Sequence, residues 1–307
     1  MNIEQTLFLG LSAYRLRCDT YEAVILPQFG ANCVSLIHRP TGTECLRVPP
    51  TAEEMADHVN VYGLPIQFPP NRILRGRFTF RGREYTFPIN EPARSCFIHG
   101  VLSAAPFEME REGVFVYHAT AEKPYLAFPH AFTLEREYRL TDEGLFHTVR
   151  VRNDSDREMP VAVGIHAAWN VFSPEAALRI PAEYQNDIDR EFIMPTGKEI
   201  TESPQLDALR KGTLQPEKEA LSTLLTTRGQ KVSLADESRA FCYDSDPSMP
   251  FVMLWNGGGG TGFVCPEPQS WVPHAPLLDW PWEKSGMDSL MPGKEKTYSL
   301  RFWMETK

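Results

Sequence analysis

Glu267 lies between two prolines in the stretch VCPEPQSW, residues 264–271. Each proline fixes its own φ at about −65° and lacks an N–H, and Pro268 pushes Glu267 toward an extended conformation. The carboxylate is therefore carried on stiff backbone, which suits a catalytic base or a group that grips a ligand. The structural alternative is a loop glutamate after an edge strand, where the prolines end the pairing.

Four further polar residues stand in apolar or proline-bent segments. Asn71 and Arg72 follow two prolines in YGLPIQFPPNRILRGRF, residues 62–78. His99 lies in FIHG, and His166 ends the apolar run of VAVGIHAAWNVF. Each has a structural alternative, since a histidine beside an apolar strand is often a hydrogen-bonded core residue and an arginine often pairs with a carboxylate.

As a set, these residues are more informative than they are singly. Two histidines, an arginine, an asparagine and a rigid glutamate contain neither metal-ligand spacing nor a nucleophile beside a base, and the chain has no H-E-x-x-H, G-x-S-x-G, phosphate-loop or dinucleotide motif. The set suits proton transfer on a neutral, hydroxyl-rich ligand. Trp169 and Trp271 are expected in the core or in a cavity wall, where an indole could also stack on a sugar.

The segments that carry these residues resemble, in order along most of the chain, those of the aldose 1-epimerase (galactose mutarotase) family. The similar segments are NRILRGRFTFRGREYTFPIN (71–90), HG (99–100), HAAWN (166–170), MPTG (194–197), PEPQS (266–270) and LMPGKEKTYSLRFWM (290–304). The resemblance implies a large antiparallel β-sandwich that interconverts the α- and β-anomers of a free monosaccharide, with no cofactor and no metal.

The resemblance also implies roles for individual residues. Glu267 matches the base that takes the anomeric hydroxyl proton, and His166 matches the acid that protonates the ring oxygen. Each would favour the charged form of the other. The substrate-binding residues that it implies are Arg72, His99, Asn71, Asn170 and Trp169.

The sequence departs from the family pattern at two points, so we expect a divergent member. No Asp-His dipeptide lies between His166 and Glu267, where the family usually has its substrate-gripping aspartate, and Ala168–Trp169 replaces the usual aromatic pair. The sugar is therefore left open, including a phosphorylated sugar bound through an arginine. The main alternative function is a non-catalytic carbohydrate-binding or sensing protein. A glycoside hydrolase would need a second carboxylate, and a metal-binding sandwich would need paired histidines.

The elements that must position these residues are predominantly strands. Runs such as ANCVSLIHR, GVFVYHATA, FTLEREYRL and KTYSLRFWM have strand character. Hairpins are predicted at Arg81–Gly82 and at 142–144, and Arg75, Arg77, Arg81 and Arg83 are expected to face solvent. Short helices are predicted at TAEEMADH, with a capping box, and at SPQLDALRKG. We therefore predict an all-β fold: one antiparallel sandwich domain over residues 1–307, with few short helices.

Composition restricts the partners. The net charge is −9 and no Lys/Arg block stands out, which argues against nucleic acid and anionic membranes. No apolar run approaches the roughly 20 residues of a membrane span, and the N-terminus lacks a signal-peptide pattern. The six cysteines form no C-x-x-C pair and are expected to be reduced core residues of a cytoplasmic protein.

Overall fold

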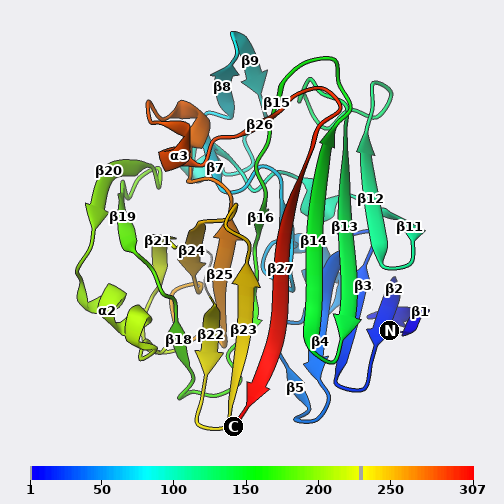
Figure 1. Ribbon diagram of the computed structural model, residues 1–307, viewed down its shortest axis with the longest axis vertical. Coiled ribbons are helices and arrows are strands. Elements are labelled where there is room, and N and C mark those ends of the chain that lie inside the picture. Colours follow the sequence, from blue (N-terminus) through cyan, green and yellow to red (C-terminus); the bar gives the residue numbers. More distant parts are fainter. Residues whose placement is uncertain (1, 228–230) are drawn as a thin grey trace.

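Antiparallel strands are the predominant secondary structure (Figure 1) in a computed structural model that describes residues 2–227 and 231–307. The first large sheet consists, in spatial order, of β11 (Glu108–Arg111), β12 (Val114–Ala119), β13 (Phe132–Thr141), β14 (Gly144–Asn153), β27 (Glu295–Thr306), β23 (Arg239–Ser245), β22 (Val232–Ala235) and β18 (Ala177–Arg179). The second consists of β20 (Pro195–Ile200), β19 (Tyr184–Ile188), β21 (Ser222–Thr226), β24 (Phe251–Trp255), β25 (Phe263–Gln269), β16 (Gly164–Ile165) and β6 (Ile66–Gln67), with β17 (Trp169–Asn170) also paired to β25.

Smaller sheets complete the fold. A five-stranded sheet contains β1 (Asn2–Phe8), β2 (Leu11–Arg17), β3 (Tyr21–Leu26), β4 (Asn32–His38) and β5 (Thr43–Glu44). Three two-stranded pairs are β7 (Arg72–Leu74) with β10 (Cys96–Ile98), β8 (Arg77–Phe80) with β9 (Arg83–Thr86), and β15 (Met159–Pro160) with β26 (Ser289–Leu290). The predicted antiparallel sandwich is confirmed.

Part of the main hydrophobic core lies between the two large sheets. Trp169, from the second sheet, has its ring centroid 4.7 Å from that of Phe241 and 5.5 Å from that of Tyr243, both on β23 of the first sheet. All three side chains are fully buried. Inward-facing side chains of the two sheets therefore contact one another directly across the core.

The predicted hairpins and helices are found where expected. β8 and β9 reverse at Arg81–Gly82, where both residues have positive φ, and the four arginines assigned to solvent are exposed. β13 and β14 reverse at 142–143, with Gly144 beginning the second strand. α1 (Ala52–Asp57) is capped by Thr51, and α2 (Pro204–Lys211) is capped by Ser203 at its N-terminus and by Gly212 at its C-terminus. α3 (Trp282–Ser285), a single turn, was not predicted from the sequence.

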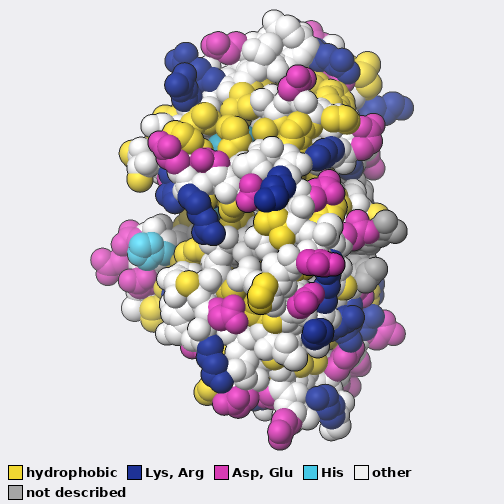
Figure 2. Space-filling view, turned by 90° about the vertical axis from the view of Figure 1, so that its left-hand side faces the viewer, with side chains coloured by type: hydrophobic (Ala, Val, Ile, Leu, Met, Phe, Trp, Pro, Cys, Tyr) yellow, Lys and Arg dark blue, Asp and Glu magenta, His cyan; other side chains and the backbone are white. Residues whose placement is uncertain are grey.

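The surface and the cysteines bear on the predicted partners. Basic and acidic side chains are interspersed on the face shown in Figure 2. All six cysteines are free thiols, and five of them are buried. Over residues 2–227 and 231–307, the helices are too short and too polar to cross a membrane.

Candidate active site

Glu267 lies in the middle of β25, so the prolines beside it do not end the strand. All of β24 pairs with residues 265–269 of β25, and Met253 lies opposite Glu267. On the other side, the partner strand is interrupted: β16 pairs at Gln269 and β17 at Phe263 and Val264. Prolines lack the N–H that a ladder needs, which fits the interruption. The prediction of a stiff, extended Glu267 agrees with this geometry, and the edge-strand alternative is wrong.

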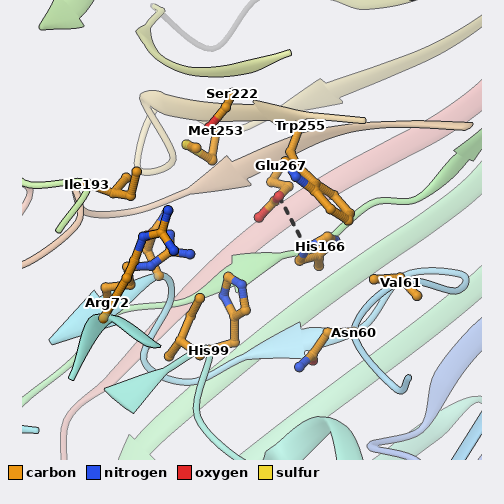
Figure 3. A pocket seen from close by; sticks show the side chains of 13 residues that line it. Asn60, Val61, Arg72, His99, His166, Ile193, Ser222, Met253, Trp255 and Glu267 are labelled. Carbon is orange, nitrogen blue, oxygen red and sulfur yellow. Dashed lines mark hydrogen bonds and ion pairs between the residues drawn. The ribbon is translucent and has the colours of Figure 1, made fainter. Parts of the chain in front are cut away.

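His166 occupies the gap between β16 and β17, directly across from Glu267. Its backbone N–H donates to the carbonyl of Pro65 at 3.0 Å. Its Nε2 lies 3.3 Å from Oε1 of Glu267, and both side chains are at least 94% buried. Figure 3 shows the two groups pointing toward one another. The interruption that the prolines favour therefore makes room for a second titratable group beside the carboxylate.

Side-chain amides hold the other oxygen of the carboxylate. Gln67 Nε2 and Gln269 Nε2 donate to Oε2 of Glu267 at 2.9 and 3.1 Å. Asn71 Nδ2 in turn donates to Oε1 of Gln269 at 3.3 Å. With Oε2 occupied by these donors, Oε1 is the oxygen that faces His166. The amides thus fix which oxygen can exchange a proton.

Burial decides where the proton of this pair resides. It raises the pKa of Glu267 to about 8, although hydrogen bonds from Gln67 and Gln269 and the charge of Arg72 act in the opposite direction. Burial also lowers the pKa of His166 to about 4, against a backbone hydrogen bond that raises it. This differs from the expected pair of charged groups, because loss of hydration outweighs their mutual attraction. Between these values the pair carries one proton, on the carboxyl group.

His99 and Arg72 complete the polar surroundings. His99 follows β10 with φ of 61°. Its ring centroid lies 5.2 Å from that of His166 in an edge-to-face arrangement, and its Nδ1 is buried without a hydrogen-bond partner among the described residues. Burial, then the charges of His166 and Arg72, hold the pKa of His99 well below its usual range. His99 is therefore a neutral ring with a hydrogen-bonding atom to spare.

These groups surround a cavity of about 360 Å³. Besides Glu267, His166, His99, Arg72 and Asn71, its wall contains Asn60, Arg94, Ser222 and Trp255, with apolar contacts from Val61, Ile98, Ile193 and Met253. Glu267 is the one carboxylate that lines it among the described residues. A concave site with a few converging polar groups and shifted pKa values is typical of a small-molecule active site.

Two residues of the predicted site lie elsewhere. Trp169 is fully buried against Phe241 and Tyr243, so its expected role in sugar binding is corrected to a core role. Asn170 is half-buried, and its Nδ2 donates to the backbone carbonyl of Glu44 at 3.3 Å. The indole that does line the cavity is Trp255, whose ring centroid lies 5.9 Å from that of His166.

Three residues of the site were not predicted from the sequence: Gln67, Gln269 and Trp255. A signal existed for Gln269, because residues two apart on a strand share a face and Gln269 follows Glu267 by two. Trp255 likewise follows Met253 by two on β24. Gln67 had no such signal, since β6 has only two residues and reaches Glu267 from 200 positions away.

No group of three or more His, Cys, Asp or Glu side chains within 2–227 and 231–307 is arranged to hold a metal ion. The described site itself offers a carboxyl and an imidazole that can exchange a proton, with amides, a second imidazole and a guanidinium as hydrogen-bonding neighbours.

Comparison with known proteins extends this picture. The family model described as aldose 1-epimerase matches residues 12–303. The uncharacterized protein YihR of Escherichia coli (strain K12) is 30% identical over 132 residues, which make up 41% of this chain and 42% of that protein. The alignment thus spans less than half of the length of that relative.

Solved structures share the whole architecture. A galactose mutarotase-like protein from Clostridium acetobutylicum superposes with a TM-score of 0.93 at 25% identity, covering 99% of this chain and 98% of that one. A GalM/aldose epimerase homologue from C. elegans superposes with a TM-score of 0.74 at 18% identity, covering 95% and 98%. The second likeness shows the fold alone.

Proposed function

The chain belongs to the aldose 1-epimerase family, and from that premise we propose that it interconverts the α- and β-anomers of a free aldose, with Glu267 and His166 as the proton-transferring groups. The observation that carries the proposal is the 3.3 Å separation of His166 Nε2 and Glu267 Oε1, both buried beside the cavity. Family membership supplies the reaction class, and this pair supplies groups able to perform it.

The reaction needs two coupled proton transfers. A base takes the proton from the anomeric hydroxyl while an acid gives a proton to the ring oxygen, so that the C1–O5 bond breaks and an aldehyde forms. The aldehyde end turns, and the reverse transfers close the ring on the other face. No net proton is gained or lost, so one proton shared by Glu267 and His166 is sufficient.

The proton count of the described pair meets this requirement. With Glu267 ionised and His166 protonated, the pair holds one proton; with Glu267 protonated and His166 neutral, it also holds one. Ring opening converts the first state into the second, and closing reverses the change. The pKa values place the free enzyme in the second state near neutrality, so proton movement from Oε1 to Nε2 precedes ring opening.

The neighbouring groups suit the binding of a sugar. Arg72 offers N–H donors to a ring or hydroxyl oxygen on which negative charge develops. The spare ring nitrogen of His99 can exchange a hydrogen bond with a hydroxyl. Trp255 offers apolar area beside His166, suited to the C–H face of a pyranose. We assign Arg72, His99, Asn71 and Trp255 to substrate binding.

Exchange between the anomeric protons, followed by magnetisation-transfer NMR on glucose, galactose and other free aldoses, tests the proposal. Wild type should accelerate exchange of at least one aldose. Glu267→Gln and His166→Asn should each lower the rate by about 10²-fold or more, the usual contribution of a positioned acid or base. The matched controls are Glu84→Gln and His118→Asn, whose side chains are exposed and outside the cavity.

Exchange that persists in both site variants would remove Glu267 and His166 from the mechanism. Binding of an aldose without any acceleration of exchange would instead support a carbohydrate-binding or sensing protein on this fold.

A further inference from the structure

A second cavity, also of about 360 Å³, borders the first. Ser222 and Trp255 belong to the walls of both. These two residues are direct partners across the β21–β24 ladder. The two cavities therefore meet at this pair of residues.

The lining of the second cavity offers hydrogen bonds of mixed kinds. Gln185 and Asp187, two apart on β19, both line it, whereas Asn186 between them is buried. Gln205, at the start of α2, accepts a 2.8 Å hydrogen bond from Thr223 through Oε1, which leaves its Nε2 for another acceptor. Asp187 accepts from Thr196 through Oδ2, which leaves Oδ1.

The charges in this lining balance. Asp187 and Arg190 contribute one carboxylate and one guanidinium, and the other polar groups are amides and hydroxyls. An anionic substituent would meet Asp187, and a cationic one would meet Arg190. A neutral polyol can donate to the first and accept from the second.

The wall between the cavities is held in place by Asn256, which is fully buried after β24. Its Nδ2 donates to the backbone carbonyls of Pro216 and Glu219 at 2.8 and 2.7 Å, and its Oδ1 accepts from the N–H of Leu221 at 2.8 Å. These bonds tie the end of β24 to the segment that leads into Ser222. The two cavities therefore keep a fixed spacing, as neighbouring subsites require.

We propose that the second cavity is a subsite for a second neutral sugar ring, so that the preferred substrate is the reducing end of a disaccharide or short oligosaccharide. The inference rests on the proposed function. Anomer exchange needs a free C1, so the second ring must be joined through another hydroxyl of the reacting sugar. Trp255 is half-buried and lines both cavities. Its indole supplies the apolar surface on which the two linked rings would lie.

The first test compares the kcat/KM of anomer exchange for glucose and galactose with that for maltose, cellobiose, lactose and melibiose. At least one disaccharide should exceed its own reducing-end monosaccharide by about tenfold, because remote binding is used to stabilise the transition state. Glucose 6-phosphate serves as the anionic comparison and should show no such gain. Monosaccharides that match or exceed every disaccharide would overturn the inference while leaving the proposed function intact.

Ala220→Trp provides the structural test, since Ala220 is exposed and lines only the second of the two cavities. The added indole should lower the disaccharide kcat/KM to the monosaccharide value and leave the monosaccharide value unchanged. Asp187→Asn should also lower kcat/KM for the disaccharide. Ala121→Trp, at an exposed alanine that lines neither cavity, is the matched control and should change neither value.

A binding measurement separates this inference from the proposed function. In saturation-transfer NMR with each of the four disaccharides, protons of both rings of at least one of them should receive saturation from wild type, and those of its non-reducing ring should lose it in Ala220→Trp. Absence of exchange on every sugar would refute the proposed function, yet this contrast would still support the second subsite. Saturation confined to the reducing ring of wild type would refute the subsite.

Discussion

Glu91 holds Arg72 by two hydrogen bonds of equal length. Arg72 Nε donates to Oε2 of Glu91 and Nη2 donates to Oε1, each at 2.7 Å, and both side chains are mostly buried. Such a bidentate pair fixes the plane of the guanidinium. Nη1 is the nitrogen that Glu91 leaves free, with a 3.4 Å bond to Asn71 Oδ1. Glu91 is absent from the cavity wall, so it acts through Arg72 as a positioning residue.

Replacing Glu91 by glutamine should weaken sugar binding more than it slows the chemistry. The variant keeps the shape of the side chain but loses one acceptor and the charge, so Arg72 is no longer held in one orientation. We expect KM to rise about tenfold, the scale of a hydrogen bond to a charged group, with a much smaller fall in kcat. Steady-state exchange kinetics on the best aldose provide the measurement.

Glu158→Gln is the control for this prediction. Glu158 holds Arg81 in the same bidentate manner at 2.9 and 3.1 Å, but on the exposed β8–β9 hairpin. The Glu158→Gln variant should therefore leave KM unchanged. If Glu91→Gln instead lowers kcat at constant KM, then Arg72 acts only in the transition state and the positioning argument is wrong.

The rate of exchange should depend on pH as a bell with limbs at about 4 and about 8. Below the pKa of His166, about 4, the pair gains a second proton and no base remains. Above the pKa of Glu267, about 8, it loses its only proton and no acid remains. The two limbs belong to the pair as a whole. A rate that continues to rise beyond the alkaline limb would exclude His166 as the proton donor.

A feature of this site could be predicted from the sequence where residues close by in the chain determine it, and could not where distant strands do. The stiffness around Glu267 and the hairpin at Arg81–Gly82 are set by neighbours in the chain, so they were predictable. Trp169 and Trp255 were not separable, because either indole follows a strand pattern and only sheet packing decides which one is buried. The reversed protonation of Glu267 and His166 was also unpredictable, since burial on that scale arises from strands far apart in the sequence.

Replacing Gln269 by leucine should move the alkaline limb to higher pH. The hydrogen bond from Gln269 lowers the pKa of the Glu267 carboxyl, so its loss raises that pKa and the pair keeps its proton further into the alkaline range. The acid limb, set by His166, should stay in place. Exchange rates across the pH range provide the measurement, with Gln215→Leu as the control, because Gln215 bonds to Glu175 on the surface. An alkaline limb that moves downward would contradict the assigned direction.

The two tryptophans should respond in opposite ways. Trp169→Leu removes a fully buried ring from the core and should cost about 3 kcal/mol of unfolding free energy, with KM unchanged. Trp255→Leu should change stability by less than that and raise KM, because the ring lines the cavity. Urea unfolding beside exchange kinetics distinguishes the two. A raised KM in a folded Trp169→Leu protein would restore the sugar-binding role first expected for that residue.

The gain in stability that Glu267→Gln gives relative to wild type should grow as the pH rises. Between the usual carboxyl pKa of 4.5 and the folded value of about 8, the unfolded chain releases a proton that folded Glu267 keeps, so the free energy of unfolding falls with pH. Each pH unit in this window costs wild type up to about 1.4 kcal/mol, and the glutamine variant escapes this cost.

His166 sharpens the prediction. Its pKa falls from 6.5 to about 4 on folding, so between these values the unfolded chain holds the extra proton and stability rises with pH. In wild type, the contributions of His166 and Glu267 cancel up to about pH 6.5, and the decline due to Glu267 follows above it. In Glu267→Gln, only the rise due to His166 remains. Urea unfolding of both proteins from about pH 5 to about pH 8 should show their difference widening throughout. A difference that stays constant would mean that folded Glu267 is ionised across this range. The free enzyme would then lack the protonated carboxyl that its proton count requires.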